Sequence, residues 1–490
     1  KQDRLSWQPF QISLRKFVTA CLARRLLGFN LVRSHAQETG SMDWQHMNIW
    51  IKNPLAILAE NAGGGIVIAG SRIVELVPAG GAPLTEVDET FDASRHAIIP
   101  GLINTHHHFF QTLCRAHPIA RDKELFPWLQ ALYPIWSRLD RDMFRVGARL
   151  AYAELLLSGC TTAMDHNYMS YDGLEDATDI EVQEAKALGI RTTVTRGSLS
   201  LSKKDGAIPD DHIVQDDDTI LADSERVLKR YHDTSDGAMT QIALAPCAPF
   251  NVSRNVMRES AALAEAYDCR LHTHLAETVD EEAFCIETFG YRPIDWLEDC
   301  NWLQPRVWLA HGIHFTCEDC EKLGKHGVGV CHCPTSNAVL ASGFCKTLDL
   351  EAAGSPVGLG VDGSASNDSS NLMEEVRHAL MVNRLGYRSA DRITHRDALR
   401  WATTGSAKCL GRSDIGEIAV GKQADLAMFT LDEMRFSGNH DPIAALVHCG
   451  ANRADRVMVA GEWRVMAGHI IGLDVARLIA EHSAAAKRFS

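Results

Sequence analysis

The chain has 490 residues, of which 49 are basic and 63 acidic, so its formal net charge is -14. This acidic balance argues against a nucleic-acid partner, because the phosphate backbone attracts positive charge. No stretch approaches the ~20 apolar residues of a membrane-spanning helix, which argues against a membrane partner. These properties favour a cytoplasmic enzyme with one large domain and an accessory one. A homo-oligomer is one allowed state.

The first 41 residues differ in composition from the rest of the chain. They carry seven basic and two acidic side chains, whereas the remainder is strongly acidic. The apolar stretch 17–23 resembles a short signal-peptide core, but two arginines follow it immediately, so a targeting segment is the weaker interpretation. We expect residues 1–41 to be a leader or an extension foreign to the native protein, which then begins at Met42 or Met47.

Short strands separated by glycines are predicted near both ends of the chain. We expect residues 42–98 and 412–475 to form one small β-sandwich domain from both chain ends, followed by a C-terminal tail over 476–490. The strand-like stretches cover residues 48–51, 65–69, 71–77, 416–429 and 456–471.

Strand-like and helix-like stretches alternate from residue 99 to residue 411. Amphipathic stretches such as 140–158 and 253–268 lie between most of the predicted strands. Eight such units over ~300 residues fit an α/β fold of the (β/α)8 TIM-type barrel, in which catalytic groups gather where the strands end. A doubly wound open sheet is the alternative. The predicted strands cover residues 98–108, 160–166, 191–196, 241–247, 270–274, 307–311, 327–333 and 356–362.

Three consecutive histidines stand at the end of the first predicted barrel strand. Side chains alternate along a strand, so His106 and His108 are expected on one face and His107 on the other. Two imidazoles on one face can hold a divalent metal and leave positions open for water. A polar strand end with solvated or hydrogen-bonded histidines is the alternative.

Three further strand ends offer ligands or proton carriers. His272 and His274 share one face of the fifth predicted strand, and Glu277 follows three residues later. His311 ends the sixth strand and Asp362 the eighth. Any one of these residues is more often an ordinary hydrogen-bonded loop residue. Four strand ends that all supply such groups indicate a metal site inside the barrel mouth.

The 14 cysteines of the chain are expected to be reduced thiols of an intracellular protein. Cys317 and Cys320 form a CxxC pair that Cys331 and Cys333 could complete as a structural zinc site. However, the first pair lies in a predicted surface helix and the second in a predicted strand, so a second zinc is the weaker interpretation.

Several strings in this order resemble the motifs of the amidohydrolase superfamily, in its branch of metal-dependent aminohydrolases that deaminate heterocycles. The resemblance extends over about residues 47–475, and the segment 416–426 is similar to the family's C-terminal β-domain signature. The matching strings are Pro100-Gly101-Leu102-Ile103-Asn104-Thr105-His106-His107-His108, His274-Leu275-Ala276-Glu277, Ala310-His311-Gly312, Cys333-Pro334-Thr335-Ser336-Asn337 and Gly360-Val361-Asp362-Gly363.

The resemblance implies one divalent metal ion, with zinc preferred, held by His106, His108, His274 and Asp362. It also implies that the metal activates a water molecule and that Asp362 accepts the proton of that water. Glu277 would then protonate a ring nitrogen and the departing amine, while His311 polarises or orients the nucleophile. An amine leaves only with a proton whereas chloride needs less help, so Glu277 favours deamination over dechlorination.

The resemblance also suggests a substrate, a small heterocyclic base. His106 to Gln111, together with Pro246-Cys247-Ala248-Pro249-Phe250, is most similar to the 8-oxoguanine deaminases, which convert 8-oxoguanine and water to urate and ammonia. Gln111 can donate to and accept from a polar ring, Cys247 leaves room for it, and Trp128 could close over it. Cys247 as a small filler and Trp128 as a core residue are the structural alternatives.

Other functions remain open from the sequence. Within enzymes, these are a hydroxytriazine N-alkylaminohydrolase and a guanine, isocytosine or pterin deaminase. Outside enzymes, the alternative is a catalytically silent metal-binding barrel. Glu277 and His311 have no structural reason to accompany a complete ligand set, and this argues against the silent barrel.

Overall fold

The computed structural model describes residues 47–489, and Met47 onward forms one compact unit. The interpretation of residues 1–41 lies outside the described residues. None of the helices in the described part is long and apolar enough to cross a membrane.

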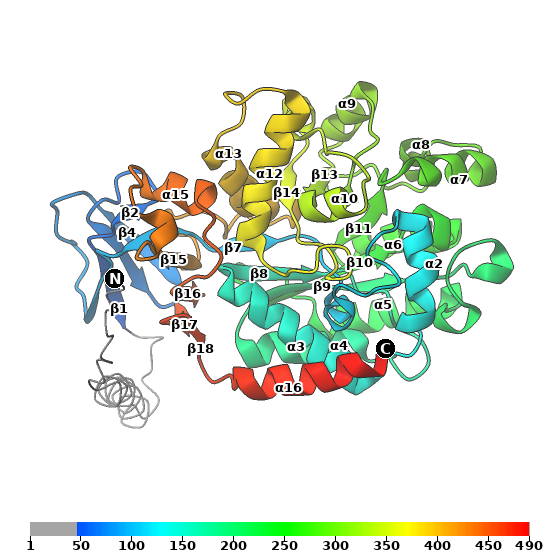
Figure 1. Ribbon diagram of the computed structural model, residues 1–490, viewed down its shortest axis with the longest axis horizontal. Helices are drawn as coiled ribbons and strands as arrows, with labels where there is room; N and C mark the ends of the chain where they lie inside the picture. The colour runs from blue at the N-terminus through cyan, green and yellow to red at the C-terminus, as the bar shows by residue number, and fades with distance from the viewer. Residues whose placement is uncertain (1–46, 490) are drawn as a thin grey trace, which may run out of the picture. The chain divides into compact units, whose positions relative to one another are not determined.

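The centre of the molecule is a sheet of eight parallel strands that follow one another in chain order (Figure 1). The first and last strands meet, because Thr105 N donates to Leu359 O over 3.0 Å and Asp362 N donates to His106 O over 3.0 Å. The predicted α/β barrel of the TIM type is therefore confirmed. Its strands are β7 (Leu102–Asn104), β8 (Cys160–Asp165), β9 (Arg191–Ser198), β10 (Thr240–Pro246), β11 (Arg270–Leu275), β12 (Val307–His311), β13 (Gly329–His332) and β14 (Val357–Leu359).

The barrel helices begin where the sequence offers capping side chains. Asp140 accepts a hydrogen bond from Met143 N and Ser253 one from Val256 N, which satisfies donors at the start of α3 and α6. The α-helices are α2 (Leu125–Trp136), α3 (Arg141–Leu157), α4 (Ala177–Leu188), α5 (Asp217–Tyr231), α6 (Arg254–Ala266), α7 (Val279–Phe289), α8 (Pro293–Asp299), α9 (Cys317–Lys325), α10 (Pro334–Val339), α11 (Thr347–Ala353), α12 (Leu372–Tyr387), α13 (His395–Arg400), α14 (Ser406–Cys409), α15 (Pro442–His448) and α16 (Val475–Ala486).

Two further sheets contain the strands from the chain ends. A six-stranded sheet has the order β18-β17-β16-β15-β6-β2 and a four-stranded sheet the order β4-β3-β1-β5. Blue N-terminal and orange C-terminal segments therefore lie side by side in Figure 1. The strands are β1 (Asn48–Lys52), β2 (Ala56–Ile57), β3 (Gly65–Ala69), β4 (Arg72–Val77), β5 (Glu89–Asp92), β6 (His96–Pro100), β15 (Leu426–Thr430), β16 (Arg456–Val459), β17 (Glu462–Met466) and β18 (His469–Ile470).

The strand predicted over residues 98–108 is two strands in two different sheets. β6 ends at Pro100 and β7 begins at Leu102, and Gly101 between them donates its N–H to Asp425 O over 2.8 Å. A Cβ at position 101 would lie 2.1 Å from Thr161 Oγ1, so only glycine fits at this crossing. The three histidines consequently follow the end of β7 rather than forming its last residues.

A buried ion pair joins the barrel to the six-stranded sheet. Arg191 at the start of β9 and Asp425 just before β15 are 0% and 3% exposed. The guanidinium Nε and Nη2 each lie 3.2 Å from a carboxylate oxygen of Asp425. Such a two-pronged pair fixes relative orientation as well as distance.

Most of the segment expected to be a tail belongs to α16, which lies against α3. The cysteines are free thiols wherever the structure describes them. The CxxC pair begins the surface helix α9, and the groups of possible metal ligands among the described residues contain histidines and one aspartate but no cysteine.

Candidate metal centre and active site

The four predicted metal ligands converge at the carboxyl ends of the barrel strands. His106 and His108 follow β7, His274 lies near the end of β11, and Asp362 follows β14. The Nε2 atoms of His108 and His274 are 3.2 Å apart. Asp362 Oδ1 lies 3.3 Å from His106 Nε2 and 3.4 Å from His108 Nε2.

Backbone carbonyls fix the tautomers of two of these imidazoles. His108 Nδ1 lies 2.9 Å from the carbonyl oxygen of His166, and His274 Nδ1 lies 2.6 Å from that of Cys247. A carbonyl only accepts, so both Nδ1 atoms carry the proton. The lone pairs on the Nε2 atoms therefore face each other, an arrangement that suits metal ligation.

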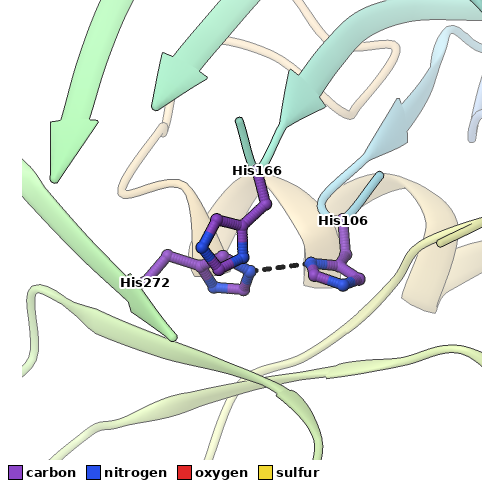
Figure 2. Close-up of side chains that lie close together, drawn as sticks. All are labelled: His106, His166 and His272. Atoms are coloured by element: carbon purple, nitrogen blue, oxygen red, sulfur yellow. Dashed lines mark hydrogen bonds between the residues drawn. The ribbon is translucent and has the colours of Figure 1, made fainter. Parts of the chain in front are cut away.

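A third imidazole, His106, is oriented by His272 (Figure 2). His272 Nδ1 donates to Trp308 O over 2.8 Å, so its Nε2 accepts from His106 Nδ1, also over 2.8 Å. His106 Nε2 then carries a lone pair, and this atom is buried without a hydrogen-bond partner among the described residues. His272 thus orients a predicted ligand from a place beside the site.

His166, at the end of β8, also faces this cluster and was not predicted. Its Nε2 donates to Ala245 O over 3.0 Å, and its ring stacks on that of His274 with centroids 4.7 Å apart. The sequence carried a signal, since the predicted strand 160–166 ends on this histidine. His166 therefore packs against His274, and it also belongs to two of the groups of possible metal ligands among the described residues.

His107 points away from the cluster, as its place between His106 and His108 suggested. Its Nδ1 accepts from the backbone N–H of His108 over 2.7 Å, and its Nε2 lies 3.0 Å from Ser370 Oγ. Arg115 also contacts Ser370 Oγ, at 3.3 Å, and forms an ion pair with Glu154. His107 thus belongs to a polar network behind the site.

The protonation states of the cluster suit a divalent cation. Burial lowers the pKa of His274 to about 3 and that of His106 well below its ordinary value, so these imidazoles are neutral. Burial alone would raise the pKa of Asp362, but the surrounding histidines hold it well below its ordinary value. Three neutral imidazoles and one carboxylate are the donor set and charge state that a divalent metal requires.

Glu277 and His311 lie beside the ligands and face each other. Asn337 Nδ2 donates to His311 Nδ1 over 3.0 Å, so His311 Nε2 carries the proton. That nitrogen lies 3.5 Å from Glu277 Oε2 and 3.9 Å from Asp362 Oδ2. Burial, then the negative charges of Asp362 and Glu281, raise the pKa of Glu277 well above its ordinary value, which favours the protonated form of its carboxyl.

Glu281 positions Glu277, a role that sequence reasoning missed. Its carboxylate oxygens accept from the backbone N–H groups of Ala276 and Glu277 over 2.9 and 3.0 Å.

Three residues at the site have a left-handed backbone: φ is 54° at Ala276, 74° at His311 and 61° at Asp362. Non-glycine residues rarely adopt this left-handed region, and such strain is typical of functional sites.

The three predicted substrate contacts, Gln111, Trp128 and Cys247, line one cavity together with Glu277 and His311. The predicted metal ligands His108, His274 and Asp362 line the same cavity. Gln111 Oε1 accepts from Ala365 N over 3.3 Å, and Trp128 Nε1 donates to Ala365 O over 3.2 Å. Cys247 is 5% exposed and follows β10. The cavity wall also includes Tyr133, Tyr168 and Asn251, which were not predicted because they come from distant segments without a motif.

An eight-stranded barrel with such donors at its strand ends defines a metal-dependent TIM-barrel enzyme of the kind that the sequence motifs suggested. A profile for the amidohydrolase family matches residues 97–464. The chain therefore belongs to the amidohydrolase family, and the resemblance in its motifs is confirmed. A divalent metal is in keeping with this family and with the buried histidine cluster.

Several known proteins are similar over most of their length. An 8-oxoguanine deaminase from Pseudomonas aeruginosa is 58% identical over 440 residues, which are 89% of this chain and 98% of that protein. A hydroxydechloroatrazine ethylaminohydrolase from Pseudomonas sp. is 38% identical, with 76% and 79% covered. The structure of an atrazine chlorohydrolase from Arthrobacter aurescens, complexed with zinc, has a TM-score of 0.84 at 30% identity and covers 89% of this chain and 100% of that one.

Proposed function

We propose that the protein catalyses the hydrolytic deamination of 8-oxoguanine, a free base in the cytoplasm, to urate and ammonia. The observation that carries this proposal is the buried carboxyl of Glu277, which lines the same cavity as His108, His274 and Asp362 and whose pKa is raised well above its ordinary value. An enzyme that expels an amine needs a proton donor at this place, whereas a protein that only binds a ligand does not. The 58% identity to an 8-oxoguanine deaminase supports the choice of base.

The proposed cofactor is one zinc ion, with His106, His108, His274 and Asp362 as ligands. The unpartnered Nε2 of His106 and the facing Nε2 atoms of His108 and His274 support this assignment. When bound, such an ion supplies Lewis-acid activation of water near neutral pH.

The side chains of the site then divide the proton transfers. Asp362, ionised in its buried position, accepts the proton of the attacking water. Glu277 donates its proton to a ring nitrogen next to the attacked carbon. It then takes the proton of the newly added hydroxyl group and passes it to the amine, as the C–N bond breaks and the carbonyl forms. The proton held by Asp362 finally returns to Glu277. His311, which presents Nε2–H toward both carboxyl groups, orients the water.

The cavity is suited to a flat polar ring. The Gln111 amide is held at its oxygen by Ala365 N and donates one N–H to the Tyr168 hydroxyl, so the second N–H remains to donate. Cys247 adds little bulk beside it, and the Trp128 ring forms another part of the wall. The proposed partner is accordingly a small heterocyclic base.

A second candidate is the removal of an alkylamino group from a hydroxytriazine. The 38% identical ethylaminohydrolase and the triazine hydrolase structures favour this reaction as the second choice. Pterin deamination follows, since an isoxanthopterin deaminase from an unknown prokaryotic organism is 35% identical over 83% of this chain and 89% of that protein. Both reactions would use the same Glu277 chemistry.

A substrate panel separates these functions. Purified protein with one equivalent of zinc is supplied with 8-oxoguanine, guanine, isocytosine, a pterin and an ethylamino-hydroxytriazine, and the released ammonia or ethylamine is measured. We expect the highest kcat/KM on 8-oxoguanine, with urate as product. Release of ethylamine but no ammonia would establish the triazine function instead, and no release from any compound would favour the silent barrel.

A further inference from the structure

Two buried tyrosines in the cavity wall have no role in the proposed proton transfers. Tyr168 follows β8, and its ring lies against that of His108 with centroids 5.1 Å apart. Its hydroxyl accepts a hydrogen bond from Gln111 Nε2 over 3.4 Å. The direction of this bond is set, because Gln111 Oε1 is already engaged by Ala365 N.

Tyr133, on α2, repeats this arrangement. Its hydroxyl lies 3.5 Å from Asn251 Nδ2, and Asn251 Oδ1 accepts from Ala248 N over 2.9 Å. Asn251 therefore presents its NH2 group to the tyrosine. An amide with a backbone-fixed orientation thus donates to each of the two phenols.

Each phenol consequently retains a proton to donate. A hydroxyl has one proton and two lone pairs, and a tyrosine with an ordinary pKa of about 10 keeps its proton at neutral pH. Across residues 47–489, the amide contact is the one hydrogen bond of either hydroxyl. Tyr133 and Tyr168 are 1% and 4% exposed. A buried donor without an acceptor is costly. We therefore expect a ligand in the cavity to supply an acceptor for each of the two hydroxyl protons.

We propose that Tyr168 and Tyr133 donate hydrogen bonds to two oxo groups of the bound base and thereby select a ring with two oxo groups over a ring with one. This inference rests on the proposed function. 8-Oxoguanine has oxo groups at C6 and C8, whereas guanine has the C6 group alone. A site built to bond an oxo group disfavours an analogue without it, because a buried hydroxyl is then left unpaired.

The variants Tyr168→Phe and Tyr133→Phe each remove one hydroxyl and keep the ring. Tyr171→Phe is the matched control, since Tyr171 is also buried but its hydroxyl donates to Leu139 O over 2.8 Å. Tyr171 is not among the residues that line the cavity. Circular dichroism, thermal unfolding and zinc content establish that each variant is folded and loaded.

The readout is kcat/KM on 8-oxoguanine and on guanine. We expect each single variant to lose about 10-fold on 8-oxoguanine. The double variant should lower the preference for 8-oxoguanine over guanine by at least about 10-fold. The control should keep the wild-type preference.

The outcomes distinguish the two proposals. If the wild type converts 8-oxoguanine and both folded single variants keep its rate and preference, the inference is wrong and the proposed function stands. If one variant fails to fold, the other still decides, since each tyrosine is proposed to bind its own oxo group. If the wild type releases no ammonia from 8-oxoguanine, the proposed function fails and the inference falls with it.

Discussion

Glu277→Gln is the most direct test of the proposed chemistry. The amide keeps the shape of the carboxyl group but cannot transfer its proton. Glu277 Oε2 lies 3.5 Å from His311 Nε2, and Glu277 is absent from the groups of possible metal ligands among the described residues. We therefore expect the variant to fold and to hold its metal as the wild type does.

The size of the effect follows from the surroundings of the carboxyl. A positioned acid or base contributes about 10²- to 10⁴-fold to a rate, or about 3 to 5 kcal/mol of barrier. Burial and the charges of Asp362 and Glu281 raise the pKa of Glu277 well above its ordinary value, which favours the donating form of the carboxyl. The full contribution is lost on substitution, and kcat should fall by at least about 10².

The assay is ammonia release from 8-oxoguanine at saturating substrate, with zinc content measured on the same samples. Glu287→Gln is the control, because Glu287 is exposed on α7. The Glu277→Gln variant should lose much less activity on an analogue with chloride in place of the 2-amino group, since chloride leaves without a proton. A Glu277→Gln enzyme with full zinc and near-normal ammonia release would refute the role of this carboxyl.

Three further outcomes are expected. His274→Ala should lower the zinc content measured by mass spectrometry at one equivalent of metal, because it removes a ligand held by Cys247 O; undiminished zinc would contradict the ligand set. The raised pKa of Glu277 predicts that kcat/KM falls as pH rises through it, and this alkaline decline should vanish from the residual activity of Glu277→Gln. Arg191→Met should lower the free energy of unfolding in urea by about 3–5 kcal/mol, because Asp425 stays buried without its partner. Arg477→Ala, at an exposed ion pair, should cost less than about 1 kcal/mol.

Local sequence signals were sufficient where local physics decides the structure. Asp140 and Ser253 begin helices because their side chains cap free N–H groups. The strand 307–311 is predicted at its observed bounds because its five residues are all buried between neighbouring strands. The predicted metal ligands come together for a related reason, since parallel strand ends meet at one edge of a barrel.

Contacts between distant segments set the limit of prediction. The apolar run on both sides of Gly101 contains no sign that the chain changes sheets there, because the partners, β15 and β8, are supplied by other parts of the chain. Tyr133 and Tyr168 meet in the cavity from a helix and a loop without a shared motif. Glu281 has the spacing of a helix residue, and its hydrogen bonds to Ala276 and Glu277 depend on the turn before that helix.

The passage of one chain segment from β6 to β7 has a consequence for synthesis. β6 pairs with β15, and Thr105 beyond β7 bonds to Leu359, so both partners leave the ribosome long after the histidines at 106–108. When these histidines have left the ribosome, the segments that hold them in position have not yet been made. A domain completes its packing as a unit. Metal loading should therefore follow release of the full chain, and a nascent chain halted before β15 should bind zinc weakly.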